Sequence, residues 1–349
     1  MTKQPSYRFV RYTEAWEQRK LGEVAQYRNG KAHENCIDEN GKYIVVNSKF
    51  ISTDGEVKKF SNKKNEALFE NEIAFVLSDV PNGRAIARTF WVEKNDKYTL
   101  NQRIAGITPI GETFPYFLYI LMNRHPYFLA FDDGAKQTNL SVSDVMGFEA
   151  YYPKYSEQQK IGAYFRNLDH LITLQQRKLE VLKEQKKTYL KLLFSAKGQT
   201  KPALRFAGFE DEWKEVKLGE IIQSISSKNY ITEYYEEGNN PVIQQGDIPI
   251  VGFSDNKPFN NFSNVILFGD HTLSLFKPET PFLLATDGIK ILHSDLTTQP
   301  FLFIMLERYL PKSQGYKRHY SLLKNELSSL PSLPEQEVIG SFFQDLDKA

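Results

Sequence analysis

The side chains with the most reactive groups are scattered along the chain, without the spacing of a known catalytic or metal site. Cys36 is the single cysteine, so no disulfide can form within the chain. The six histidines also stand far apart, at His33, His125, His170, His271, His293 and His319. A structural role or simple exposure is the better interpretation for each of them. The sequence therefore predicts no metal site and no cofactor site.

Motifs of the common nucleotide-dependent and hydrolytic enzymes are missing from the sequence. It contains no G-x-x-x-x-G-K-[ST] loop, no G-x-G-x-x-G, no H-E-x-x-H and no C-x-x-C. Glu-x-Lys triplets at Glu56–Lys58 and Glu212–Lys214 could belong to a nuclease site, but 25% charged residues make such triplets common by chance. No N-P-P-[YF] or D-P-P-[YF] string of a base-methylating site occurs. The sequence therefore predicts a binding protein with no catalytic residues.

The sequence contains one structural unit in two copies. "AWEQRKLGEVAQ" from Ala15 and "DEWKEVKLGEII" from Asp211 match with an offset of 197, and Arg8–Phe9 recurs at Arg205–Phe206 with the same offset. "PKYSEQQKIGAYFRNLD" from Pro153 recurs as "PSLPEQEVIGSFFQDLD" from Pro331 with an offset of 178. Between these ends lies a third pair, "GAKQTNLS" from Gly134 with "GYKRHYS" from Gly315, and a weaker fourth, "FPYFLYILM" from Phe114 with "QPFLFIMLE" from Gln299. Four matches in the same order predict a duplication whose two copies share a scaffold and differ inside.

A long helix is predicted between the two copies, over residues 156–196. Ser156 with Gln159 forms a capping-box pattern, and no Gly or Pro interrupts the chain from Ala163 to Ala196. Apolar residues recur with alternating spacings of four and three, which predicts a coiled-coil seam that needs a partner helix. The predicted seam is Ile161, Phe165, Leu168, Ile172, Leu179 and Leu182, with polar interruptions at Gln175 and Lys186. About 40 residues of helix would be roughly 60 Å long.

Charge is concentrated on this predicted helix. The whole chain has a net charge of only +1, which by itself does not indicate nucleic-acid binding. Residues 156–201 contain ten Lys or Arg residues against four acidic ones, a local charge of +6. This pattern fits a solvated helix face or a surface that meets phosphates or a partner protein.

The bodies of the two copies are predicted to be compact α+β domains. Short apolar runs bounded by Gly, Asn, Asp and Pro indicate strands in both. In the first copy these runs are "KYIVVNSKFI", "NEIAFVLSD", "GRAIARTFWV" and "QRIAGITPI"; in the second they are "NPVIQQGDIPIVGF", "NVILFG", "HTLSLF" and "PFLLATDGIKIL". The predicted domains are 1–155, the helix 156–196, the linker and second body 197–334, and the start of a second long helix at 335–349.

No segment has the pattern of a membrane span or a secretion signal. The most apolar stretch, residues 114–131, is broken by Asn123, Arg124, His125 and Pro126. Its unbroken part is far shorter than the ~20 residues that a span needs, so we expect a buried helix followed by a turn. The N-terminal residues lack an apolar core region. With a single cysteine, these features lead us to expect a cytoplasmic protein.

The motif set resembles the specificity (S) subunits of type I restriction–modification systems. The shared features are the repeat that opens with "EWKEVKLGEI", the loop "GYKRHYS" or "GAKQTNLS", and the closing "P…EQ…I…F…LD" that runs into a Lys-rich heptad helix. The resemblance covers essentially the whole chain. It implies two target recognition domains separated by long helices that pair as an antiparallel coiled coil, and no catalytic activity in this chain.

The resemblance also implies partners. They are double-stranded DNA, two methyltransferase (M) subunits that dock on the helices and domain edges, and restriction (R) subunits that join the complex. Each domain would read one half of a bipartite, asymmetric site. A rod of roughly 60 Å is long enough to hold apart two half-sites separated by one turn of DNA, which is about 34–36 Å. Because the two domains differ, they would recognise two different half-site sequences.

The resemblance places the two Gly-started loops next to DNA. Arg and Lys favour guanine edges in the major groove, and Asn and Gln favour adenine edges. The candidate loop residues are Lys136, Gln137, Thr138 and Asn139 in the first copy and Tyr316, Lys317, Arg318, His319 and Tyr320 in the second. Further candidates are Arg84, Arg88, Gln102, Arg103, Lys290 and His293. Pro153, Glu157, Gln158 and their repeats Pro331, Glu335 and Gln336 are expected to mark the junction of domain and helix.

One departure from the family pattern concerns the second long helix. It should run some 40 residues from Glu335, but the sequence stops at Ala349. We therefore expect a truncated second helix, or another chain that completes the seam. The alternatives from other classes are the recognition part of a single-chain restriction enzyme, a coiled-coil adaptor that does not bind DNA, and a repressor or antitoxin. The missing catalytic motifs, the basic loops and the missing helix-turn-helix pattern argue against these three in turn.

Overall fold

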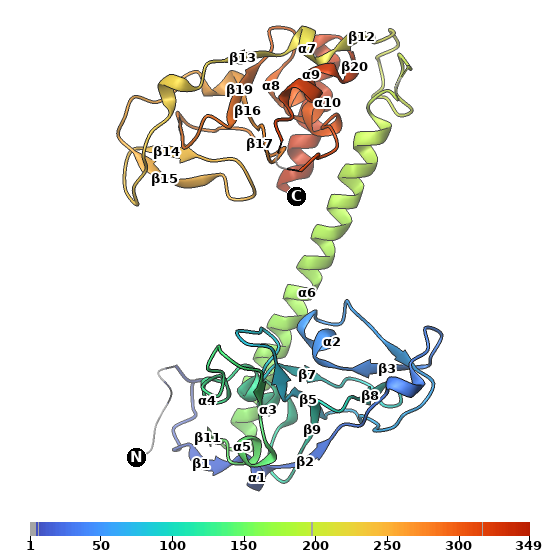
Figure 1. The fold of residues 1–349 in the computed structure, drawn as a ribbon, viewed down its shortest axis with the longest axis vertical. Coiled ribbons are helices and arrows are strands. Elements are labelled where there is room, and N and C mark those ends of the chain that lie inside the picture. Colours follow the sequence, from blue (N-terminus) through green and yellow to red (C-terminus); the bar gives the residue numbers. More distant parts are fainter. Residues whose placement is uncertain (1–4, 6, 197, 316) are drawn as a thin grey trace. The chain divides into compact units, whose positions relative to one another are not determined.

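The computed structural model of the chain describes residues 5, 7–196, 198–315 and 317–349. The chain divides into two compact units, unit 1 at Met1–Leu174 and unit 2 at Gln175–Ala349. Each unit is an α+β body with its own apolar core (Figure 1). In the described residues no helix is both long enough and apolar enough to cross a bilayer. No cluster of His, Cys, Asp and Glu side chains in the same residues is arranged to hold a metal ion.

Unit 1 contains a four-stranded sheet in the order β2–β9–β5–β7 and a three-stranded sheet in the order β4–β3–β8. The strands of the larger sheet are β2 (Ala25–Asn29), β9 (Ile104–Pro109), β5 (Ile73–Val76) and β7 (Thr89–Trp91), and those of the smaller are β4 (Phe60–Ser61), β3 (Tyr43–Val46) and β8 (Tyr98–Leu100). Two antiparallel pairs complete the unit: β1 (Glu17–Lys20) with β11 (Glu149–Tyr152), and β6 (Ser78–Asp79) with β10 (Thr138–Asn139). Its helices are α1 (Leu21–Val24), α2 (Ser48–Ser52), α3 (Pro115–Met122), α4 (Pro126–Leu129), α5 (Val142–Met146) and the start of α6 (Tyr155–Leu192).

Unit 2 repeats the topology of the two larger sheets and of the β1–β11 pair, but its described residues have no counterpart of the β6–β10 pair. Its sheets have the orders β13–β19–β16–β17 and β15–β14–β18, and β12 pairs with β20 as β1 pairs with β11. The strands are β12 (Lys214–Lys217), β13 (Gln223–Ile225), β14 (Asn240–Ile243), β15 (Ile250–Ser254), β16 (Ile266–Gly269), β17 (Leu275–Phe276), β18 (Leu283–Leu284), β19 (Ile289–His293) and β20 (Leu327–Leu330). The helices are α7 (Leu218–Ile221), α8 (Gln299–Arg308), α9 (Tyr320–Asn325), α10 (Leu333–Lys348) and the end of α6. The α+β class, the duplication and the long helix are thus confirmed.

The central strand of each larger sheet is buried on both faces, which explains its unbroken apolar run. In β5, Ile73 and Phe75 pack in the core beneath the helices, whereas Ala74 and Val76 pack toward the smaller sheet. In β16, Ile266 and Phe268 face the first kind of core and Leu267 faces the second. The predicted strand "KYIVVNSKFI" is wrong in its second half, because Asn47 accepts a hydrogen bond from the Phe50 N–H at 2.9 Å and caps α2.

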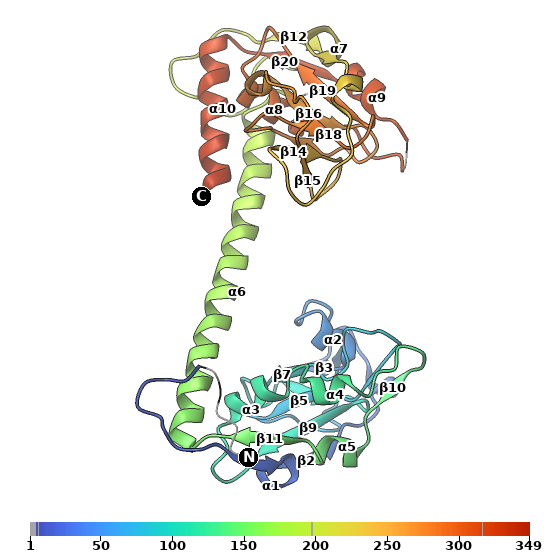
Figure 2. The same cartoon turned by 90° about the vertical axis from the view of Figure 1, so that its left-hand side faces the viewer.

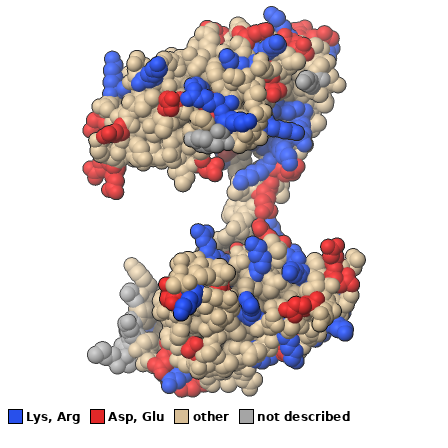
Figure 3. All heavy atoms as spheres, viewed as in Figure 1, with Lys and Arg blue, Asp and Glu red and all other residues tan. Residues whose placement is uncertain are grey.

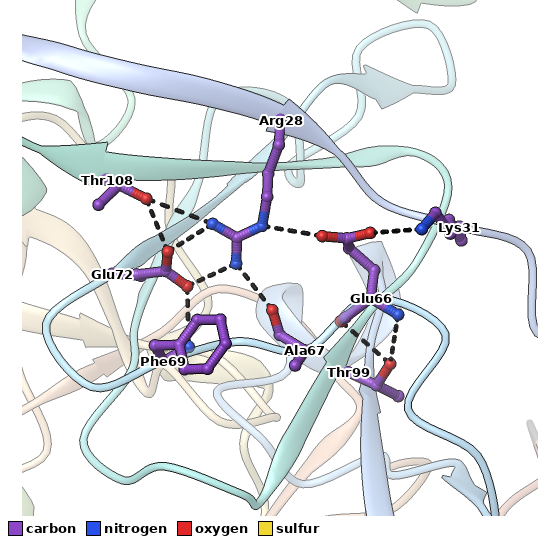
Figure 4. A network of polar contacts seen from close by, with 8 residues as sticks. All are labelled: Arg28, Lys31, Glu66, Ala67, Phe69, Glu72, Thr99 and Thr108. Atoms are coloured by element: carbon purple, nitrogen blue, oxygen red, sulfur yellow. Dashed lines mark hydrogen bonds and ion pairs between the residues drawn. The ribbon is translucent and has the colours of Figure 1, made fainter.

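The interiors of the units differ at Arg28, on β2 of unit 1. Its guanidinium donates to Glu72, to Glu66 at 3.0 Å and to the Ala67 carbonyl at 2.7 Å (Figure 4). Glu72 also accepts from the Thr108 hydroxyl at 2.6 Å and the Phe69 N–H at 2.8 Å. Burial alone would raise the pKa of Glu72, but these hydrogen bonds favour the carboxylate and leave its pKa below the usual value. In unit 2 the position that matches Arg28 by the offset of 197 is the apolar Ile225.

Replacing Glu72 by Gln is expected to destabilise unit 1 in a pH-dependent way. Because the pKa of Glu72 is lower in the folded than in the unfolded state, its contribution is present above the ordinary carboxyl range and is lost as pH falls. We expect the variant to lose about 2–3 kcal/mol of unfolding free energy at pH 7. The difference from the parent should shrink as the pH falls below about 4.3. Urea unfolding from pH 7 to pH 3 measures both, with Glu70→Gln as the exposed control. A difference that stayed constant over this range would contradict this assignment.

A buried clamp joins each body to its long helix. In unit 1, Arg8 donates from Nε and Nη2 to the two carboxylate oxygens of Glu157 at 2.7 and 2.6 Å. In unit 2, Arg205 makes the same pair with Glu335 at 2.7 and 2.8 Å. Both glutamates are only 1% exposed. In each pair the arginine guanidinium therefore replaces the water that the carboxylate has lost on burial.

A glutamine beside each glutamate connects the helix to a loop of the body. That loop precedes α3 in unit 1 and α8 in unit 2. Gln158 accepts from the Phe114 N–H and donates to the Glu112 and Pro153 carbonyls. Gln336 repeats these bonds with the Thr298 N–H and the Leu296 and Pro331 carbonyls. These contacts make Phe114 equivalent to Thr298, so the sequence-based match of Phe114 with Gln299 is wrong by one residue.

Helix α6 is a single element of 38 residues. It begins at Tyr155, so Ser156 lies in its first turn, and the predicted cap at Ser156 is wrong. It ends at Leu192, four residues before the predicted end, because the chain turns there and buries Leu193 and Phe194 in the core of unit 2. At 1.5 Å per residue its length is about 57 Å.

Within unit 2, α6 and α10 run antiparallel, as Figure 2 shows. Lys178 donates to the Ala349 carbonyl at 2.7 Å, Lys186 pairs with Asp347 at 2.9 Å, and the Tyr189 and Phe342 rings are 5.1 Å apart. Lys186, a polar interruption of the predicted seam, also pairs with Glu307 at 2.8 Å. Burial would lower the pKa of Lys186, but these two carboxylates outweigh it and raise the pKa. The interruption is therefore an ion-pair site.

The rest of the predicted seam differs in burial along the helix. Ile161 packs against the core of unit 1, and Leu168 and Leu182 are half-buried. Phe165, Ile172 and Leu179 are 40%, 55% and 52% exposed. The described residues thus leave the middle of this apolar face uncovered.

Candidate nucleic-acid interface

In unit 1 the structure brings three loops together at the end of strand β5. Strand β6, which follows β5, pairs with β10 through Ser78–Asn139 and Asp79–Thr138. On its other side, the Leu77 N–H donates to the Arg103 carbonyl at 3.1 Å. The loops 79–88, 101–103 and 132–139 therefore meet, and all the sequence-predicted DNA-binding residues of unit 1 lie on them.

Asp79 holds the first of these loops. Its carboxylate accepts from the backbone N–H groups of Val80, Ala85 and Ile86 at 2.9, 2.6 and 3.0 Å. The Gly-started loop is fixed in a similar way, because Asp133 accepts from the Ala135 and Lys136 N–H groups at 2.9 and 3.1 Å. These bonds lower the pKa of Asp133. Gly134 has φ +69°, a conformation that favours glycine.

The predicted residues of unit 1 differ in what they present to solvent. Lys136, Gln137, Asn139, Arg84, Gln102 and Arg103 are exposed. The Gln137 amide donates to the Ser78 hydroxyl at 2.8 Å, which orients it. Arg88 is half-buried, with its Nε donating to the Arg84 carbonyl at 2.9 Å. Thr138 is only 6% exposed and donates to Asp132 at 3.1 Å, so its role is to hold the loop.

Unit 2 builds the equivalent loop on Asp270, which follows β16. Asp270 accepts from the backbone N–H groups of His319 and Tyr320 at 2.8 and 2.7 Å. His319 is fully buried; its Nε2 accepts from the Gln314 N–H at 3.0 Å, so its Nδ1 carries the proton and donates to the Asp270 carbonyl at 3.0 Å. The structure therefore places His319 inside the unit as the anchor of the loop, without a ring edge to offer DNA.

The other predicted residues of unit 2 are divided between two places. Lys317 and Arg318 are exposed on the loop, and Arg318 lies 3.7 Å from Asp287 of the neighbouring loop. Tyr320 and Lys290 are half-buried, and Tyr316 lies outside the described residues. His293 is at the far end of β19, opposite Gln223 and 4.0 Å from Asp295, so the structure does not bring it to the loop. Figure 3 shows basic side chains gathered on the visible face of unit 2 and acidic ones at its β14–β15 end.

The two loops follow one plan. By their shared offset of 181, Lys136 matches Lys317, Gln137 matches Arg318, and Thr138 matches His319. The first two pairs are exposed and the third is buried in both units. Sequence reasoning missed the anchors Asp79 and Asp270. A signal for them was present, since each ends an apolar run, "AFVLSD" and "NVILFGD".

Comparisons with known proteins agree with this architecture. The chain is 23% identical to the Type I restriction enzyme MjaVIII specificity subunit of Methanocaldococcus jannaschii, over 97% of this chain and 87% of that protein. The crystal structure of a Type-I restriction-modification system S subunit from M. genitalium has the same fold, with a TM-score of 0.69 at 20% identity over 97% of this chain and 91% of that one. The sequence profile of the Type I restriction modification DNA specificity domain matches residues 13–184 and again residues 210–349. This chain, with two copies of that domain, belongs to the type I restriction–modification specificity family.

Proposed function

We propose that the chain is the non-catalytic specificity subunit of a cytoplasmic type I restriction–modification complex and reads a bipartite, asymmetric site on double-stranded DNA. The observation that carries this proposal is the pair of matched loops. Both lie beside an aspartate that follows the central strand, Asp79 in unit 1 and Asp270 in unit 2, and both present an exposed lysine followed by a second exposed side chain that can contact a base edge. That side chain is Gln137 in unit 1 and Arg318 in unit 2.

The difference between these two side chains fits two different half-sites. A Gln amide pairs best with the N6 and N7 edge of adenine, and an Arg guanidinium pairs best with the O6 and N7 edge of guanine. Lys136 and Lys317 would contact phosphates, which position the loop without reading sequence. The exposed Arg84, Gln102 and Arg103 of unit 1 extend the same surface. The ion pair of Arg318 with Asp287 is exposed on both sides and weak, so DNA can replace it.

Helix α6 would act as the spacer and as part of the docking surface for M subunits, which in turn recruit R subunits. Support comes from its continuous 38 residues, its exposed apolar face and the basic residues 177–191. In this proposal residues 1–155 are the first recognition domain and 197–334 the linker with the second recognition domain, while 156–196 form the spacer helix and 335–349 the start of a second spacer helix. With a net charge of only +1, the chain would rely on its partners for much of the phosphate contact.

Replacing Arg318 by Ala should weaken binding of the complex with M subunits to its cognate DNA by about 1–3 kcal/mol, because one bidentate base contact is lost. Arg318→Gln should instead shift preference at one base pair from guanine toward adenine. A gel shift with competitor DNA measures the first effect, and binding to a set of single-base variants measures the second. Lys257→Ala, an equal charge loss on the exposed loop after β15, is the control. Unchanged affinity and unchanged methylated sites in Arg318→Ala would remove Arg318 from the interface.

A further inference from the structure

Unit 1 has an apolar groove beside the start of α6. It has a volume of about 510 Å³ and is lined by Tyr7, Phe9, Trp16, Ile161, Tyr164 and Phe165. The Arg8–Glu157 pair also borders it, so its charges are already neutralised. Tyr164 and Phe165 are 51% and 40% exposed there. Exposed aromatic side chains gathered in one concave place indicate a binding surface rather than an ordinary solvent face.

The internal repeat shows what fills the same place in unit 2. The equivalent residues there are Leu204, Phe206, Trp213, Ile339, Phe342 and Phe343. Trp213 is 2%, Ile339 1% and Phe343 0% exposed. They belong to one apolar cluster with Tyr189, Leu193 and Phe194, at the end of α6.

The contacts define how that helix end sits in unit 2. The Phe194 ring lies 6.2 Å from Trp213 and stacks on Phe301 at 5.6 Å between ring centroids. The Tyr189 ring meets Phe342 edge-on at 5.1 Å. The Leu204 N–H donates to the Leu192 carbonyl at 2.9 Å, which ties the strap 204–206 to the helix end. In unit 1 the matching strap 7–9 borders the groove, and no described residue fills the place that Phe194 has in unit 2.

The equivalent residues Trp16 and Trp213 differ in hydrogen bonding, in line with the open groove in unit 1 and the filled one in unit 2. The Trp213 indole N–H donates to Glu335 at 3.1 Å. The Trp16 indole N–H is buried and has no partner among the described residues, although Glu157 stands at the equivalent place. A buried donor without an acceptor is unfavourable. Among the described residues Trp16 therefore lacks the hydrogen bond that Trp213 makes in unit 2.

We propose that this groove binds the end of a partner α-helix that carries the pattern of Tyr189–Phe194: an aromatic residue, then Leu and Phe four and five positions later. Asp169 adds charge complementarity, because it is the exposed equivalent of Asp347, which pairs with Lys186 three residues before Tyr189. A second copy of this chain is not the occupant, because its own Leu193 and Phe194 are 3% and 1% exposed within its unit 2. This inference does not depend on which DNA bases the loops read.

A peptide with the sequence of residues 178–196, labelled with fluorescein, tests the site on the full chain. We expect saturable binding by fluorescence anisotropy and a blue shift of tryptophan emission that is lost in Trp16→Phe. The same peptide with Tyr189, Leu193 and Phe194 replaced by Ala should bind at least tenfold more weakly. Phe165→Lys in the protein should also weaken binding at least tenfold. The control Leu171→Lys changes another exposed apolar residue of α6, outside the groove, and should leave binding unchanged.

Three results would overturn the proposal. The peptide could fail to bind a protein whose thermal unfolding shows that it is folded, or it could bind Phe165→Lys as tightly as the parent. The third is a dimer of the parent chain, in sedimentation, that Phe165→Lys dissociates, since a second copy would then occupy the groove. Loss of DNA recognition in Arg318→Ala with peptide binding intact, or the reverse, would separate this site from the proposed reading function.

Discussion

Inserting one heptad into α6 is expected to change the distance between the two recognised sequence blocks or to abolish methylation. A second copy of residues 174–180 placed after Glu180 adds two helical turns and about 10 Å. It turns the helix beyond the insertion by only about 20° from its original direction. Ten ångströms correspond to about 3 base pairs of DNA. If α6 fixes the separation of the two readers, the gap should lengthen by that amount, or methylation of the original site should fall at least tenfold.

The measurement is a map of methylated positions in cells that carry the variant with its M subunits. A substitution that alters the exposed residues of 174–180 without changing the length of the helix controls for lost surface contacts. Adding four residues instead of seven should be more damaging, because it turns the helix by about 40° as well as lengthening it. If the heptad variant marked the original sites at the original efficiency, α6 would not set the distance.

The largest effect on stability is expected for Glu335→Gln. Glu335 is 1% exposed and accepts from Arg205 and from the Trp213 indole, so the change leaves a guanidinium without its opposite charge inside unit 2. Breaking a buried pair in this way costs about 3–5 kcal/mol. Hydrogen exchange of peptides from α8 and β16 reports on this unit. Glu337→Gln, on an exposed position of the same helix, is the matched control and should change little.

The repeat supplies a second comparison for this prediction. Glu157 holds Arg8 as Glu335 holds Arg205, but Trp16 does not donate to it. The effect of Glu157→Gln on unit 1 should therefore be smaller than that of Glu335→Gln on unit 2, by about the 1.5–3 kcal/mol of one hydrogen bond to a charged group. Equal effects would show that the indole bond contributes nothing. A folded and fully protected Glu335→Gln would show that the clamp is not what holds the junction.

Much of the fold could be predicted from the sequence because the matched segments are those that build the scaffold. Glu335 and Gln336 recur as Glu157 and Gln158 because the two side chains make the same contacts at the junction of body and helix in both units. The apolar runs that became β5 and β16 were clear because both faces of these strands are buried. The order of strands in each sheet could not be read in this way, because it depends on pairings between distant segments.

The site was harder to predict because burial within a loop depends on partners elsewhere in the chain. His319 and Arg318 are neighbours in one polar loop, yet one is buried and the other exposed. What separates them is Asp270, 49 residues earlier, which accepts the His319 N–H. In the sequence Lys186 only interrupts the apolar seam, whereas in the structure it pairs with Glu307 and Asp347. In both cases the deciding residue lies far away in sequence.

In the proposed function, two units with the same architecture each read one half of the site through different loops. Making the units alike tests it most directly: the body of unit 1 between β1 and β11, residues 17–152, is replaced by the body of unit 2 between β12 and β20, residues 214–330. We expect cells carrying this chain and its M subunits to methylate a site whose two blocks have the same sequence, which is the block read by unit 2. A methylated site that still contained both original blocks would contradict it.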